Sequence, residues 1–162
     1  MGDPGGPAPL RHVIARALPE DAPVMLAIQR RAFTEEARRC GTFDIPPMTE
    51  PLEAIALHVR EQFALTARDG ATIVGCVRGI VEDGVCTIRA LVVEPSHHGR
   101  GIGTSLLRAI EDAVRGSVSR IDLTTNTIME GNVPFYERHG YRITGRTVYT
   151  EAIVLAHLSK PG

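Results

Sequence analysis

The stretch Leu91-Val-Val-Glu-Pro95, followed closely by His98-Gly-Arg-Gly-Ile-Gly-Thr104, decides how the rest of the chain is interpreted. Three glycines at alternate positions remove side chains and let the backbone turn tightly. Apolar residues at helical spacing then predict a helix that starts at about Gly103 and ends before Gly116. Successive N–H groups in such a turn, together with a helix N-terminus, suit phosphate or pyrophosphate. Arg100 would add a charged contact to the same ligand.

Three kinds of phosphate-binding turn contain glycines in a comparable arrangement. The Rossmann pattern G-x-G-x-x-G is not met, because the position of its third glycine is occupied by another residue. That residue is Thr104 if the pattern starts at Gly99, and Leu106 if it starts at Gly101. A P-loop requires Gly-Lys-Ser/Thr, and this turn has no lysine. The third kind is the coenzyme A loop of an acetyltransferase. A glycine-rich connection with no ligand is the remaining alternative from the turn by itself.

The segments around the turn predict an α+β domain built on a mixed sheet. Asp69-Gly70 and Asp83-Gly84 are hairpin signals and predict an antiparallel meander of three strands. Asp21 is the expected N-cap of the first helix, which Gly41 ends. Strands are expected at residues 10–18, 63–67, 72–81, 85–93, 120–125, 141–148 and 152–158, and helices at 22–40, 49–59, 103–114 and 133–139. The strands on either side of the third helix should be parallel.

Composition narrows the function classes. The 162 residues include 18 Lys and Arg against 19 Asp and Glu, so the net charge of -1 gives no general attraction to nucleic acid or acidic membranes. We expect neither as a partner. No apolar run approaches the ~18 residues of a membrane span, and the first residues do not resemble a signal peptide. Residues 1–9 are expected to be a flexible lead, and 10–162 a single domain.

The three cysteines, Cys40, Cys76 and Cys86, are widely spaced and predict neither disulfides nor a CxxC metal site. Cys76 and Cys86 lie in apolar strand-like runs, where a buried thiol is the ordinary interpretation. The histidines show no metal-ligand spacing either, so no metal is predicted. A reduced, cytoplasmic setting is expected.

A second run, Phe135-Tyr-Glu-Arg-His-Gly-Tyr141, lies one predicted strand after the glycine-rich helix. With both runs in this order, the chain resembles the GNAT family of N-acetyltransferases. The family has Arg/Gln-x-x-Gly-x-Gly/Ala after a strand ending in Val-x-Pro, and later Phe/Leu-Tyr-Glu-x-x-Gly-Phe/Tyr. The order of strands and helices also matches, so the resemblance covers nearly the whole chain after Pro9. The departure is His98, where the family usually has Arg or Gln.

The resemblance implies a mostly antiparallel mixed sheet of about seven strands with four helices, whose two central parallel strands splay apart. Acetyl-coenzyme A (acetyl-CoA) would insert between these strands as the cosubstrate. The residues implied in binding it are Leu91, Val92, Val93, His98, Gly99, Arg100, Gly101, Ile102, Gly103, Thr104 and Asn132. A backbone N–H near Val93 would stabilise the oxyanion. Asn132 is also the expected N-cap of the short helix.

Tyr136 matches the family's general acid, which protonates the departing thiolate. The base stays open among Glu35, Glu36, Glu82, Asp83, Glu94 and water. Many family members have an acid two residues before the position of Leu91, and this chain has Arg89 there. If Arg89 faces the pocket, it would bind a carboxylate on the acceptor. A solvent-facing or paired arginine is the alternative.

The resulting prediction is an N-acetyltransferase that moves the acetyl group to a primary amine by direct attack in a ternary complex. A small-molecule amine is favoured over a protein as acceptor, and the segment 33–51 is expected to choose it. The alternative is a non-catalytic module that senses acyl-CoA. The resemblance also allows a homodimer.

Overall fold

The structure, a computed structural model, describes residues 12–162 and contains one seven-stranded sheet in the order β1-β2-β3-β4-β5-β7-β6. Every neighbouring pair is antiparallel except β4 and β5, which are parallel. The strands are β1 (His12–Arg16), β2 (Phe63–Asp69), β3 (Thr72–Glu82), β4 (Val85–Val93), β5 (Arg120–Asn126), β6 (Arg142–Val148) and β7 (Val154–Pro161). This confirms the predicted α+β fold.

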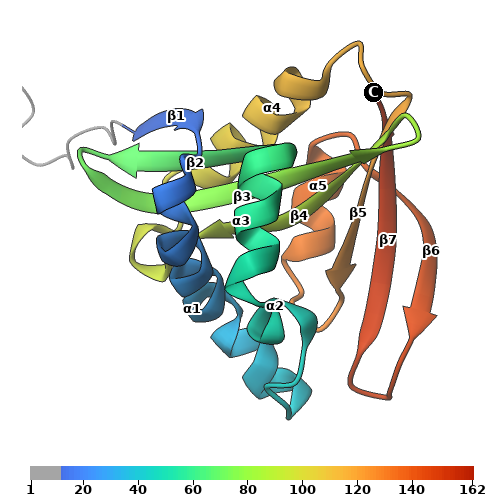
Figure 1. The fold of residues 1–162 in the computed structure, drawn as a ribbon. Helices are drawn as coiled ribbons and strands as arrows, with labels where there is room; N and C mark the ends of the chain where they lie inside the picture. The colour runs from blue at the N-terminus through green and yellow to red at the C-terminus, as the bar shows by residue number, and fades with distance from the viewer. Residues whose placement is uncertain (1–11) are drawn as a thin grey trace, which may run out of the picture.

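Helices cover both faces of the sheet. Figure 1 shows α1 (Ala22–Cys40) and α3 (Leu52–Glu61) in front of the first four strands, with α4 (Ile102–Val114) behind them. The shorter helices are α2 (Pro46–Thr49) and α5 (Asn132–Arg138), with 3-10 turns at Pro19–Asp21 and Pro95–His97. None of the helices within residues 12–162 is long and apolar enough to cross a membrane.

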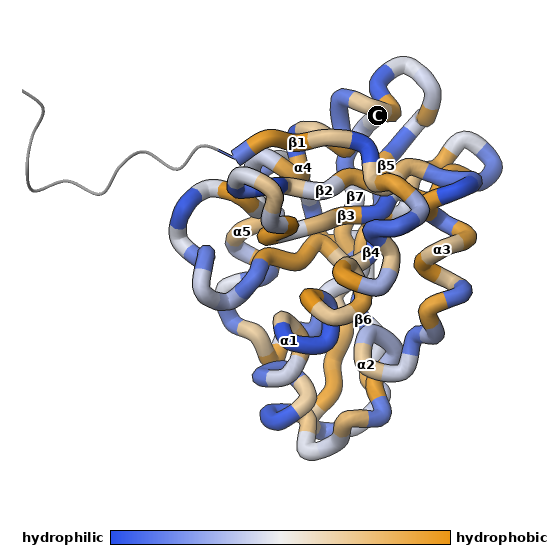
Figure 2. The backbone as a smooth tube through the Cα atoms, turned by 60° about the vertical axis from the view of Figure 1, so that its left-hand side comes forward, coloured by the Kyte–Doolittle hydropathy of each residue, from blue (hydrophilic) through white to orange (hydrophobic). Residues whose placement is uncertain are grey.

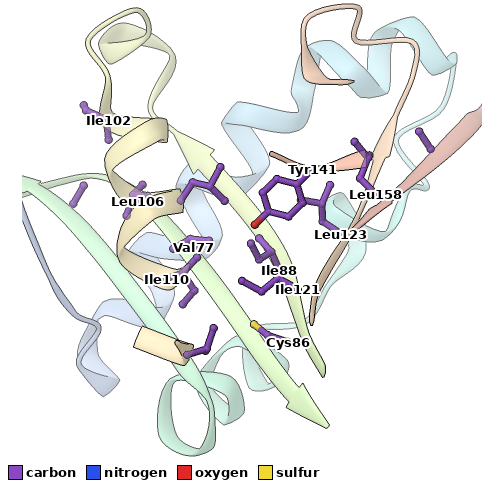
Figure 3. Close-up of a cluster of buried hydrophobic side chains, with 14 of the residues drawn as sticks. Val77, Cys86, Ile88, Ile102, Leu106, Ile110, Ile121, Leu123, Tyr141 and Leu158 are labelled. Atoms are coloured by element: carbon purple, nitrogen blue, oxygen red, sulfur yellow. The ribbon is translucent and has the colours of Figure 1, made fainter. Parts of the chain in front are cut away.

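The hydrophobic core has two parts, one on each face of the sheet. On one face, α4 contributes the fully buried Leu106, Leu107 and Ile110 to a cluster with residues of the central strands and Tyr141. Figure 3 shows Leu106, Ile110 and Tyr141 in this cluster. Burying each of these aliphatic side chains contributes roughly 1.5–3 kcal/mol. On the other face, α1 and α3 bury a second cluster that includes Ile28 and Ile55. Figure 2 shows the hydrophobic residues concentrated in the central strands, with hydrophilic ones in the connections.

The parallel strands β4 and β5 are paired only over their first residues. The register runs from Val85 opposite Arg120 to Thr87 opposite Asp122, and no pairing continues beyond it. Past this point the two strands diverge (Figure 1), which confirms the predicted splay. A bulge adds to it, because the β3–β4 register shifts between Cys76 and Arg78 and Ala90 has a φ of 52°.

Several local predictions need correction. Residues 46–49 form the unexpected short helix α2, since Pro46 and Pro47 occupy a first turn that needs no N–H donors. Asp21 does not cap α1; its carboxylate accepts from the Leu18 N–H at 2.7 Å and pairs with Arg68. Asn132 is the first helical residue of α5, whose N-cap is Gly131. The predicted first strand begins with residues 10 and 11, which lie outside the described residues, as does the predicted lead 1–9.

Candidate active site

A cleft of about 1140 Å³ occupies the space between the diverging strands β4 and β5. Its walls come from β4, β5, α1, the glycine-rich turn, α5 and the β6–β7 connection. Ten of the predicted site residues line it: Leu91, Val93, His98, Gly99, Gly101, Ile102, Gly103, Thr104, Asn132 and Tyr136. The structure thus brings together most of the residues that the sequence assigned to cofactor binding and catalysis.

Two of the predicted residues do not line the cleft. The Val92 side chain is buried in the core cluster under α1 and α3, because β4 alternates its side chains between the two faces. Arg100 is exposed on the glycine-rich turn and is absent from the cleft wall. Any contact of Val92 with a ligand in the cleft would therefore have to come from its backbone.

The glycine-rich turn presents a row of free backbone donors. Gly99 and Gly101 have φ values of 76° and 78°, in the left-handed region that glycine adopts without strain. The first helical hydrogen bond of α4 runs from the Ser105 N–H to the Gly101 carbonyl at 3.0 Å. Within residues 12–162, the N–H groups of residues 99–104 donate to no other group. Six donors at a helix N-terminus suit an anionic, phosphate-bearing ligand.

The cleft edge of β4 supplies a second row of backbone groups. Pairing with β5 ends at Thr87, so residues 88–93 have no strand partner on that side. His98 returns to this strand, and its Nε2–H donates to the Val93 carbonyl at 3.1 Å. His98, which stands where the family usually has Arg or Gln, thus holds the turn against the end of β4. An extended ligand with amide groups could pair with this edge as an added strand does.

Tyr136 projects from α5 into the cleft. Its ring packs edge-on against Phe135 and Tyr141, with ring centroids 5.1 Å and 5.8 Å away. The hydroxyl makes no hydrogen bond to any residue in 12–162, so it is available to a ligand. Burial raises the pKa of Tyr136 to about 12, which keeps the phenol protonated at neutral pH. Asn132 fixes α5 to β5 by donating from Nδ2 to Thr125 Oγ1 at 2.9 Å.

Among the acids considered as the base from the sequence, Glu36 is the one that lines the cleft. It lies on α1, is 9% exposed, and faces the end of β5 near Asn126. Burial raises the pKa of Glu36 from 4.5 to about 7, with a hydrogen bond from Asn126 opposing the rise. The carboxyl group is therefore divided between its neutral and charged forms at neutral pH.

The other candidate bases are occupied or distant. Glu35 is exposed and pairs with Arg38 and Arg39, and Glu82 and Asp83 lie at the exposed β3–β4 turn. Glu94 accepts two hydrogen bonds of 2.8 Å from Arg31, a contact that helps to hold its pKa below the usual value. Of the five acids named from the sequence, only Glu36 lines the cleft.

Comparison with known proteins places this geometry in a family. The model of the Acetyltransferase (GNAT) family matches residues 23–141, which is most of the chain. The chain belongs to the GNAT acetyltransferase family. The uncharacterized N-acetyltransferase YjcF of Bacillus subtilis (strain 168) is 33% identical over 85 residues, 52% of this chain and 59% of that protein. The chain therefore spans about three-fifths of the length of this curated relative.

Solved GNAT structures share the fold over nearly the whole chain. The PaiA N-acetyltransferase from Thermoplasma acidophilum, in complex with coenzyme A, superposes with a TM-score of 0.77 at 13% identity, covering 94% of this chain and 99% of that one. An aminoglycoside 6'-N-acetyltransferase complexed with coenzyme A gives 0.73 at 20% identity, covering 92% and 96%. At these identities the likeness concerns the fold.

The half of the cleft around Arg78 was not predicted from the sequence. Arg78 on β3 is only 2% exposed, yet both of its terminal nitrogens are hydrogen-bonded: Glu50 accepts from them at 3.0 and 2.6 Å. Gln29 Oε1 and His58 Nδ1 lie 2.9 Å from the same guanidinium. The available sequence signal was a lone arginine within an apolar strand, and its partners lie 20 to 49 residues away.

Arg89 also lines this half of the cleft, which answers the question left open by the sequence. It is exposed, and within the described residues it makes no hydrogen bond or ion pair.

The three cysteines are free, and burial raises the pKa of Cys76 to about 12 and that of Cys86 to about 11. These two thiols are buried, as predicted, and lie outside the cleft.

Proposed function

We propose that this cleft binds acetyl-CoA and transfers its acetyl group to a primary amine by direct attack. One observation carries the proposal: the same cleft is lined by the unpaired end of β4, by five of the six residues with free N–H groups and by a phenol that makes no hydrogen bond. Family membership supports acetyl transfer, and coenzyme A is bound in neighbours of the same fold. The chain's own residues define what each part of the cleft would do.

The cofactor's two polar regions correspond to the two rows of backbone groups. The pyrophosphate would accept hydrogen bonds from the N–H groups of residues 99–104, at the positive end of α4. The amides of the pantetheine arm would run beside residues 88–93, where β4 lacks a neighbour. The acetyl group would then lie deep in the cleft, between the acid on α1 and the phenol on α5.

Glu36 is the base in this proposal. An alkylamine with a pKa near 10.4 is neutral to only about one part in a thousand at pH 7. A carboxylate with a pKa of about 7 accepts a proton far more readily than an exposed glutamate does. The amine nitrogen forms a bond to the thioester carbon, the C–S bond breaks, and the amine's proton passes to Glu36 directly or through water.

Tyr136 acts on the leaving sulfur. Coenzyme A departs as a thiolate, and the Tyr136 hydroxyl is the free donor that the cleft offers to it. A phenol with a pKa of about 12 is a weak acid, so complete proton transfer is favourable only if the same dry cleft also raises the pKa of the thiol. Before transfer, the phenol stabilises the developing negative charge by a hydrogen bond.

We further propose a small-molecule amine as the acceptor. The acceptor half of the cleft lies under α1 and α2 and the β6–β7 connection, where Phe33, Ile45 and Tyr149 contribute apolar surface. The aminoglycoside enzyme with the same fold is named for a small-molecule acceptor. The competing function, an acyl-CoA sensor without turnover, was suggested by the missing acid at Arg89, and Glu36 now offers an acid elsewhere in the cleft.

The test is release of free coenzyme A from acetyl-CoA across a panel of primary amines. Tyr136→Phe should lower kcat by about 10²- to 10⁴-fold, because it removes the donor to the leaving sulfur. Tyr141→Phe is the matched control, since it removes a neighbouring hydroxyl that donates to Glu111 and does not line the cleft. Tight acetyl-CoA binding without turnover on any amine would replace the enzyme with the sensor.

A further inference from the structure

Arg89 lies on the acceptor side of the cleft because of its position in β4. Ile88 points into the core beneath α4, so the alternation of the strand sends Arg89 to the face covered by α1 and α3. The bulge at Ala90 then shifts the alternation, and Leu91 and Val93 pack on the α4 side. The arginine thus points away from the face on which the glycine-rich turn and α4 lie.

The charges around Arg89 leave it without a counter-ion. Its sheet partner Arg78 is already neutralised by Glu50, whose two oxygens accept three hydrogen bonds from Arg78 and Gln29. Burial and the two arginines lower the pKa of His58, which favours its neutral form, so this histidine contributes no charge of its own at neutral pH. Glu36 and Asp44 also line the cleft, but neither forms an ion pair with Arg89. Within residues 12–162, the exposed Arg89 therefore faces the cleft without a carboxylate in contact.

We propose that Arg89 binds a carboxylate of the acceptor, so that the substrate is an amino acid or an amine of similar chemistry. This inference rests on the proposed function and specifies its substrate class. A guanidinium presents a planar fork of donors that matches a carboxylate. Thr87, two residues earlier on the same face of β4, also lines the cleft and offers a hydroxyl beside the fork.

Position argues against the cofactor as the partner of Arg89. The free N–H groups that suit the pyrophosphate are at residues 99–104, beyond the bulge and on the α4 side. Arg89 is instead grouped with Glu50, Arg78 and Gln29. The cleft residues from α1 and α2, including Pro46 and Pro47 of α2, line the acceptor side.

The test compares amine pairs that differ only in the carboxylate, such as lysine and lysinamide, each with saturating acetyl-CoA. The wild-type protein should favour the carboxylate by about 10- to 100-fold in kcat/KM. Arg89→Gln should bring this ratio close to one, and Arg89→Lys, which keeps the charge and loses the fork, should give an intermediate ratio. Comparing ratios between proteins cancels the different basicities of the two amines.

Arg115→Gln is the matched control, because Arg115 pairs with Asp112 at the far end of α4 and does not line the cleft. It should keep the wild-type ratio. A second arm replaces the amino acid with short peptides that end in a free carboxylate or an amide, which separates a free amino acid from a peptide terminus as the source of the carboxylate.

Equal kcat/KM for the members of each pair in the wild type, or an unchanged preference in Arg89→Gln, would overturn the inference and leave the proposed acetyl transfer intact. No turnover of any amine, charged or neutral, would overturn the proposed function and with it the inference.

Discussion

Arg78 of β3 and Arg89 of β4 are partners in the sheet register, but only Arg78 has a carboxylate. Its bond to Glu50 is two-pronged and its guanidinium is 2% exposed. The two neighbouring arginines therefore have different roles. One arginine is part of the buried framework that fixes α2 and α3 on the sheet, and the other is free to meet a ligand. The framework can be tested separately from the chemistry.

Glu50→Gln should destabilise the protein by about 3–5 kcal/mol at pH 7, because it leaves the Arg78 charge buried without its partner. Burial favours the neutral acid, but hydrogen bonds from Arg78 and Gln29 outweigh it and hold the pKa of Glu50 at about 2. Because this pKa is lower than in the unfolded chain, the stability that the wild type has over Glu50→Gln should be complete above about pH 4.5. This difference in the free energy of unfolding should decrease as the pH falls toward 2. Urea unfolding across pH measures it.

The control for that experiment is Glu53→Gln, an exposed glutamate in the first turn of α3. A loss of stability equal to that of Glu50→Gln would contradict the account of the buried pair.

Glu36→Gln should stabilise the protein while it slows acetyl transfer. The pKa of Glu36 rises from 4.5 in the unfolded chain to about 7, so ionising it in the folded state costs roughly 3 kcal/mol above pH 7. Wild-type stability should therefore fall as the pH rises from about 4.5 to 7, and the glutamine variant should lack this loss. Denaturant unfolding at pH 5 and pH 8 provides the comparison.

The same pKa predicts the pH profile of the reaction. Because the base must be ionised, the wild-type kcat/KM should have a limb that rises with pH and ends at about 7, in addition to the rise caused by the amine's own ionisation. The limb that ends at about 7 should be absent in Glu36→Gln. Glu35→Gln, at the exposed neighbouring position, should keep both the limb and the wild-type stability curve. A limb that persists in Glu36→Gln would remove Glu36 from the mechanism.

Gly101→Ala should weaken coenzyme A binding beyond its effect on folding. At a φ of 78° an alanine costs about 1 kcal/mol, and its Cβ would enter the open space beside the free N–H groups. Gly116→Ala matches it, because Gly116 has a φ of 79°, equally open surroundings and a position outside the cleft. Thermal unfolding should show similar losses in both, and calorimetry a lower coenzyme A affinity only for Gly101→Ala.

Local signals explain what the sequence could predict. The helix α1 ends at Cys40 because Gly41 adopts a φ of 73°, and β4 spans Val85–Val93 as expected, since the left-handed Asp83-Gly84 turn marks its start. Cleft residues in the glycine-rich turn and α5 were also found, because each lies in a contiguous run.

The acceptor side was largely hidden from the sequence, because its contacts join distant segments. Nothing local distinguishes Glu35 from Glu36; only the direction of α1 over the splayed strands buries one and exposes the other. Likewise, Asp21 looked like a cap until the fold placed Arg68 beside it. Pairings over tens of residues depend on the assembled sheet.

A labelled acetyl group can be followed from acetyl-CoA in the presence and absence of an amine. Direct attack in the cleft predicts that the label appears on the amine nitrogen, that no acetylated protein forms without amine, and that Tyr136→Phe slows the transfer. Label on the protein before the amine is added, or no transfer to any amine, would contradict the account.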